Sequence, residues 1–114
     1  MPFPRHLHDK EKSVIVAMAR GLPIENVVLN AVHDAVVQEM NDGGMGSLKF
    51  LYSHPPSVPG FSQIREATYA DGDGVPVSIT LNVDRDGRLY ELDIWKADNS
   101  PLKIFPTPES LYIK

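Results

Sequence analysis

The chain has no cysteine among its 114 residues. Disulfide bonds, thiolate metal sites and cysteine nucleophiles are therefore excluded. Long apolar runs are also missing, because the longest, Val14 to Ala19, is far shorter than the roughly 20 residues of a membrane-spanning helix. The first residues lack the apolar core of a signal peptide. We therefore expect a cytoplasmic protein without a membrane partner.

The sequence has no excess of positive charge, since its formal net charge is −4 at pH 7. Nucleic-acid-binding domains usually concentrate basic residues on one face, so no nucleic-acid partner is expected. A mildly acidic chain suits a basic protein partner. The 42% of apolar and 23% of charged residues are typical of a soluble domain. We expect a single domain over 1–114 that folds without a metal or other cofactor.

Two helices are expected in the N-terminal third, after an irregular lead-in over 1–8. Asp9 can cap a first helix that runs to about Arg20. Pro23 is well placed as the first residue of a second helix over 24–32, which a strand over 34–40 would follow. A single helix over 23–40 stays open as an alternative, because the local apolar runs fit both interpretations.

The remaining segments alternate between apolar and polar residues, which is typical of strands. The expected strands cover 47–52, 63–70, 75–83 and 89–96. The clearest is 75–83, where β-branched residues and leucine occupy every second position. That row predicts one buried face and one small, polar face.

The segments between these strands indicate how they pair. Aspartate and glycine at 71–74 and 84–87 form tight turns, and the proline-rich segment 54–60 is a loop. Successive strands with short turns pair antiparallel. We therefore predict an α+β fold, with two N-terminal helices packed on a roughly five-stranded antiparallel meander sheet. The tail over 99–114 is expected to be extended and to pack on the sheet.

The strand over 89–96 carries the main candidate site. Its alternation places Leu89, Glu91, Asp93 and Trp95 on one face and Tyr90, Leu92 and Ile94 on the other. An aromatic residue beside carboxylates suits a partner contact, and a carboxylate pair can also perform acid–base catalysis if one member is desolvated. Lys49 or Arg65 from neighbouring strands would instead make a cross-strand charge ladder.

The glycine-rich segment 42–47 is a second candidate, although it lacks the lysine of a phosphate-binding loop. Met45 within it would be a contact residue if exposed and a core residue if buried. The two Asp-x-Asp-Gly segments resemble calcium loops, but their twelfth positions, Asn82 and Trp95, cannot supply the bidentate glutamate. No metal ligand set and no catalytic nucleophile are assigned.

Three motifs together resemble a family of small uncharacterised bacterial proteins. They are DGGMGS at 42–47, ADGDGVPVSITLNVD at 70–84 and ELDIWKADNSPL at 91–102. The resemblance covers the C-terminal two thirds of the chain and implies no activity, so no catalytic residue is transferred. Small proteins of this build resemble antitoxin or immunity proteins by analogy only.

Three functions remain open from the sequence. The leading hypothesis is a non-enzymatic protein-binding module, of immunity or antitoxin type, that uses Glu91, Asp93, Trp95 and Met45. The second is a small-ligand-binding domain or an enzyme, with Glu91, Asp93, Glu66 and His33 as acid–base candidates. The third is a structural module that self-associates through a strand edge or the Trp95 face.

Overall fold

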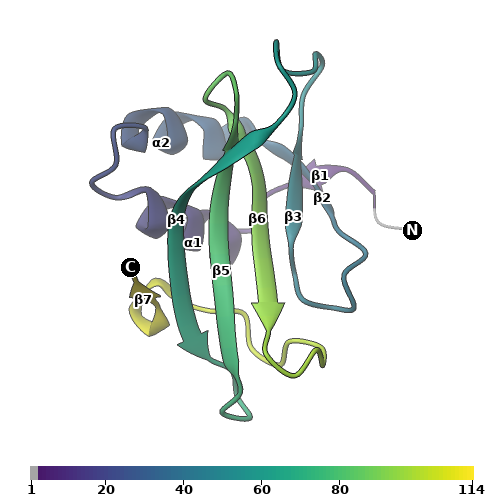
Figure 1. Ribbon diagram of the computed structural model, residues 1–114, viewed down its shortest axis with the longest axis vertical. Helices are drawn as coiled ribbons and strands as arrows, with labels where there is room; N and C mark the ends of the chain where they lie inside the picture. The colour runs from purple at the N-terminus through teal and green to yellow at the C-terminus, as the bar shows by residue number, and fades with distance from the viewer. Residues whose placement is uncertain (1–2) are drawn as a thin grey trace.

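A seven-stranded antiparallel sheet with two helices on one face forms the framework of the protein (Figure 1). The structure is a computed structural model, and it describes residues 3–114. In chain order the elements are β1 (Arg5–His6), α1 (Asp9–Ala19), α2 (Glu25–Asp34), β2 (Val36–Glu39), β3 (Leu48–Leu51), β4 (Phe61–Ala70), β5 (Pro76–Asp84), β6 (Leu89–Lys96), the 3-10 helix η1 (Pro108–Ser110) and β7 (Tyr112–Ile113). The α+β prediction is confirmed.

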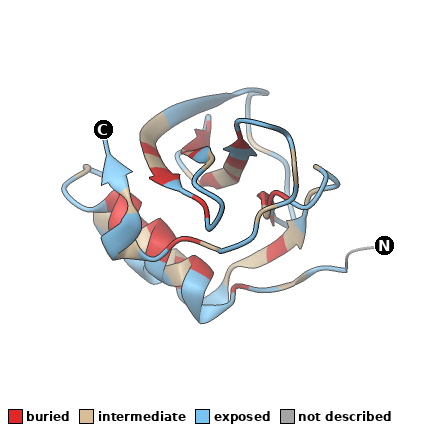
Figure 2. Cartoon of the chain, turned by 90° about the horizontal axis from the view of Figure 1, so that it is seen from below, coloured by how far each residue is buried: buried red, intermediate tan, exposed pale blue. Residues whose placement is uncertain are grey.

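The core lies between the helices and the sheet. Seen from below, the buried positions of α1 and α2 are on the side of each helix that faces the strands (Figure 2). The predicted apolar row of β5 points into this core, where Val77, Ile79 and Leu81 are buried. We call this side of the sheet the inner face and the opposite side the outer face.

The strand order corrects the predicted meander. The order is β1-β2-β3-β6-β5-β4-β7, so β3 pairs with β6 and not with β4. Tight turns force β4, β5 and β6 to pair in succession. The proline-rich segment after β3 imposes no such pairing, because it is too long and too rigid for a hairpin. It carries the chain across the sheet, and β3 lies beside β6 in a Greek-key arrangement.

Two short edge strands account for the difference between five and seven strands. β1 falls within the expected lead-in and pairs with β2, so residues 5–6 are not irregular; residues 1–2 lie outside the described part of the chain. β7 pairs with β4. Before β7 the tail runs behind the sheet on its inner face (Figure 1), where the Tyr69 hydroxyl donates a 2.8 Å hydrogen bond to the carbonyl of Ile104.

The choice between two elements and one long helix is settled in favour of two. α2 ends at Asp34 and β2 begins at Val36, so the single helix over 23–40 is wrong. Ala35 leaves the helical conformation with φ −57° and ψ 136°. Pairing with β3 satisfies the backbone hydrogen-bonding groups of the extended β2 segment. This pairing joins residues distant in the chain, so a local sequence pattern does not reveal it.

A β-bulge corrects one expected side-chain direction. Leu89 was placed on the same face as Trp95, but it is buried in the core. The register shifts between Asn82 and Val83, so that Asn82 pairs with Glu91 and Val83 with Leu89. One extra residue in β6 reverses the alternation on one side of the bulge.

The turn before β5 and the end of β6 are joined by a cluster of buried charges, which we call the Lys96 ion cluster (Asp71, Asp73 and Lys96). The Lys96 ammonium is fully buried and lies 2.7 Å from a carboxylate oxygen of each aspartate. Its third acceptor is the carbonyl of Pro101, at 3.3 Å. Every ammonium hydrogen can therefore be satisfied, as burial requires.

Asp71 connects this cluster to the tail. Its carboxylate accepts backbone hydrogen bonds from Gly72, Lys103 and Ile104 at 2.7–2.8 Å. Burial works to raise the pKa of Asp71, but Lys96 and these three donors outweigh it and hold the pKa well below its usual value. The chain after β6 is fixed to the turn before β5 by this residue.

The bend at 42–47 completes the same end of the molecule. Asp42 accepts hydrogen bonds from the backbone N–H groups of Met45 and Ser47, each at 3.1 Å. The backbone N–H of Ile94 donates to the Ser47 hydroxyl at 2.9 Å. The backbone N–H of Leu102 donates to the Gly44 carbonyl at 3.1 Å. The three motifs that resemble the uncharacterised family, at 42–47, 70–84 and 91–102, are therefore in contact through these hydrogen bonds and ion pairs.

We predict that Asp71→Asn lowers the melting temperature by roughly 10–20 °C, because it removes one charge from a buried ion group. Thermal unfolding followed by circular dichroism measures this. Glu109→Gln, at an exposed position of η1, is the control and should change the melting temperature little. Equal melting temperatures for the two variants would contradict the structural role of Asp71.

Adjacent glycines of the bend provide a matched pair of substitutions. Gly43 and Gly44 have φ of +78° and +85°, but only at Gly44 would a Cβ meet a neighbour, Pro101, at 3.2 Å. Gly43→Ala should cost about 1 kcal/mol of unfolding free energy from the left-handed backbone alone. Gly44→Ala should cost about 1 kcal/mol more from the added contact. Urea unfolding compares them, and equal costs would argue against close packing of Pro101.

Candidate functional site

The outer face of the sheet brings together two rows of side chains from β6, β5 and β4. The antiparallel register aligns Trp95 with Ser78 and Thr68 in one row, and Asp93 with Thr80 and Glu66 in the next. Residues two apart on a strand share a face and lie about 6.5 Å apart. The candidate residues of β6 therefore face the polar side of β5 and β4.

Trp95 forms one wall of a shallow hollow on this face. The indole side chain is 54% exposed, although its strand lies in the interior of the sheet and Trp95 pairs with Ser78 of β5. The hollow measures about 130 Å³ and is lined by Thr68, Pro76, Val77, Ser78, Trp95 and Ala97. We call it the Trp95 hollow. It exists because the small Ser78 lies between larger neighbours.

Two half-buried carboxylates stand beside Trp95 on the same strand. Partial burial raises the pKa of Asp93, and the negative charge of Asp42 adds to this shift, whereas a 2.9 Å hydrogen bond from Asn82 opposes it. Partial burial also raises the pKa of Glu91, and the charge of Asp93 adds to it. Both groups therefore resist ionisation more than free carboxyls do.

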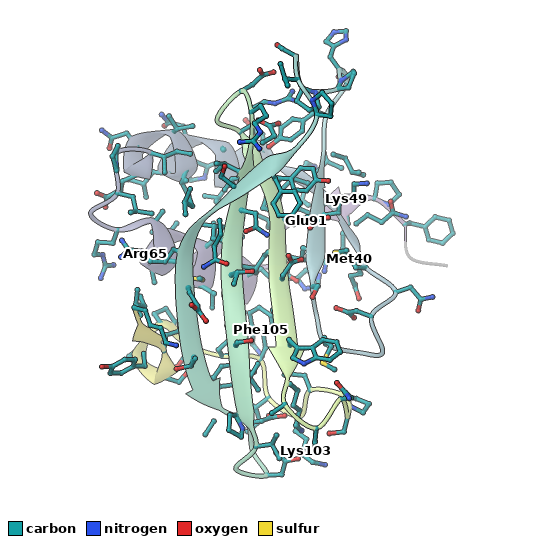
Figure 3. The ribbon with its side chains drawn as sticks, in the orientation of Figure 1. Met40, Lys49, Arg65, Glu91, Lys103 and Phe105 are labelled. Atoms are coloured by element: carbon teal, nitrogen blue, oxygen red, sulfur yellow. The ribbon has the colours of Figure 1, made fainter. Side chains whose placement is uncertain are left out.

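One of the two candidate cations of the expected charge ladder lies beside Glu91. Lys49 is the register partner of Glu91, and the two side chains lie side by side on the outer face (Figure 3). Arg65 points to the inner face instead, and donates to the carbonyls of Met18 and Arg20 at 2.8 and 2.7 Å. It thereby satisfies the C-terminal end of α1.

Met45 belongs to the core and not to the outer face. It is 1% exposed, and its sulfur accepts a hydrogen bond from the backbone N–H of Lys96 at 3.4 Å. Of the two alternatives for this residue, the structure has the core one. Met45 therefore does not share the outer face with Trp95, because the bend folds it inward.

The acid–base candidates do not converge. Glu66 shares the outer face with Asp93, and Thr80 separates the two. Glu66 lies 3.7 Å from the Lys114 ammonium. His33 is exposed on α2, whose buried residues pack on the inner face. The four groups therefore do not surround a common point where a substrate atom could react.

A family model described as Domain of unknown function (DUF6984) matches residues 4–106 of the chain. The chain belongs to the DUF6984 family. No curated protein and no solved structure matches it. The resemblance to proteins without a known function is thereby confirmed.

Two further observations on this DUF6984 chain concern metal ligands and membrane-spanning helices. Within residues 3–114, no three histidine, aspartate or glutamate side chains gather in a way that would hold a metal ion. Over the same residues, no helix has the length and apolar character to cross a membrane.

Sequence reasoning missed the other walls of the Trp95 hollow. Ser78 was correctly assigned to the polar side of its strand, but Thr68 comes from β4, whose alignment depends on a bulge between Gln63 and Arg65. Burial of Lys96 was also missed. The alternation with Leu92 and Ile94 pointed Lys96 inward, and the two aspartates of the 71–74 turn were the signal for its counter-charges.

The raised pKa of Glu91 makes a testable prediction about pH. In the interval between the ordinary glutamate pKa and the raised one, the folded state binds more protons than the unfolded state, so wild-type stability falls as pH rises. Glu91→Gln lacks this ionisation. The variant should therefore gain stability relative to wild type between about pH 4 and pH 7, by about 0.5 kcal/mol because both carboxylates are screened by solvent.

Urea unfolding at several pH values measures this difference. Glu109→Gln is the matched control, and its difference from wild type should stay constant. Parallel stability curves for wild type and Glu91→Gln would show that Glu91 is not desolvated in the folded state.

Proposed function

We propose that this DUF6984 chain is a non-enzymatic protein-binding module whose contact surface is the outer face around Trp95. The observation that carries the proposal is the exposed indole on an interior strand of the sheet, where Trp95 pairs with Ser78 of β5. Tryptophan is enriched among residues that dominate protein interfaces, and a fixed strand loses little entropy when a partner binds.

The charge of the surface supports a protein partner. Within residues 3–114, no lysine or arginine lies within ion-pair distance of Asp93. A half-buried carboxylate that has a hydrogen bond but no cationic partner, and that lies beside an aromatic ring, favours a basic group from outside the chain. An enzyme is less well supported than a binding module, because Glu66, Glu91 and His33 do not converge on one point.

Self-association through a strand edge is the second candidate. The edge strands β1 and β7 contain two residues each, and β7 pairs with only Ala67 and Thr68 of the ten-residue β4, so much of that edge has no strand partner within residues 3–114. Within the proposed class, an immunity or antitoxin role is the analogy suggested by small size and acidic charge. A toxin encoded by a neighbouring gene would support that finer assignment.

We expect Trp95→Ser to reduce recovery of a specific protein partner at least tenfold, in line with the loss of an interface anchor residue. The tagged chain is used to capture partners from an extract of the organism that encodes it, and captured proteins are quantified by mass spectrometry.

Val27→Ser is the matched control, because Val27 is also 54% exposed but lies on α2, away from the outer face. The control should retain the partner. Retention of the same partner by Trp95→Ser, or equal loss in both variants, would refute the proposed surface.

A further inference from the structure

The Trp95 hollow has the shape of a receptor for a flat group. Trp95 and Thr68 stand about 10 Å apart across Ser78, from the usual spacing of neighbouring strands. The gap is floored by the small Ser78 and bordered by the indole ring. A planar group that enters it can lie along the face of the indole.

The lining of the hollow is uncharged, and the neighbouring row of the outer face carries two carboxylates. Asp93 and Glu66 stand in the next row, on either side of Thr80, and the negative charge of Asp42 acts on Asp93. The cations of this region, Lys49 and Lys114, are associated with Glu91 and Glu66. Asp93, which has no ion-pair partner among residues 3–114, is therefore available in the adjacent row as a counter-charge for a cation in the hollow.

We propose that the Trp95 hollow receives the guanidinium group of an arginine presented by the protein partner, an inference that rests on the proposed function. The guanidinium is planar and weakly hydrated, and it stacks on aromatic faces more readily than an ammonium group. Asp93 and Glu66 accept its N–H groups from the adjacent row. The net charge of −4 favours approach of a basic surface.

The probe is a short acetylated and amidated peptide, Gly-Arg-Gly, compared with the same peptide carrying citrulline. Citrulline has nearly the shape of arginine but no charge. Since the chain contains one tryptophan, its fluorescence reports on the hollow directly, and amide NMR shifts locate the contact. The arginine peptide should bind about tenfold more tightly than the citrulline peptide.

Charge-removing variants test the predicted counter-ions. Asp93→Asn combined with Glu66→Gln should reduce arginine-peptide affinity to the citrulline level, whereas Glu109→Gln should leave it unchanged. A far-ultraviolet circular dichroism spectrum like that of wild type verifies that the double variant is folded. Raised ionic strength should weaken binding of the arginine peptide and leave that of the citrulline peptide unaffected.

Equal affinity for the two peptides, no binding of either, or NMR shifts away from residues 66–68, 76–80 and 93–97 would each overturn the inference. Dimerisation abolished by Trp95→Ser in light scattering would assign the hollow to a second copy and also overturn it. If the arginine peptide does not bind but a partner is still captured in a Trp95-dependent way, the arginine inference fails and the proposed protein-binding function stands. Peptide binding without such a partner would instead refute the proposed function.

Discussion

The ion pairs of the buried Lys96 ammonium are the interaction that holds together the turn before β5, the end of β6 and the tail. An isolated charge in a protein interior is strongly unfavourable, so Lys96 requires both Asp71 and Asp73 near it. Asp71 in turn binds the backbone of the tail. One desolvated cation therefore determines where the turn before β5, the end of β6 and the residues after it must lie.

This arrangement explains why the three motifs contain the residues they do. The bend at 42–47 supplies Met45 beneath the backbone of Lys96, and Gly44 lets Pro101 approach closely. Side chains that resemble calcium ligands or a binding loop in sequence are used to hold the strands together. The glycine-rich bend and the Asp-x-Asp-Gly turn at 71–74 are therefore structural, whereas the main candidate residues Glu91, Asp93 and Trp95 remain on the outer face.

The Lys96 ion cluster also determines which side chains of β6 reach the outer face. Because Lys96 and Ile94 are fixed in the core, the residues between and before them, Trp95 and Asp93, must point outward. The outward position of an indole is thus a consequence of inner-face packing on the same strand, by the two-residue alternation of a β-strand. The proposed contact surface is rigid for this reason, and a partner would bind it without reordering the strand.

The sequence by itself determined much of the local structure: the helix α1, the tight turns, the inward row of β5 and the outward direction of Asp93 and Trp95. These follow from short-range periodicity and turn chemistry, which depend on residues close in the chain. Only the tertiary structure decided that β3 pairs with β6, that Leu89 and Met45 are buried, and that Thr68 lines the Trp95 hollow. Each of these depends on a register or a loop crossing between distant segments, and a bulge of one residue is enough to change it.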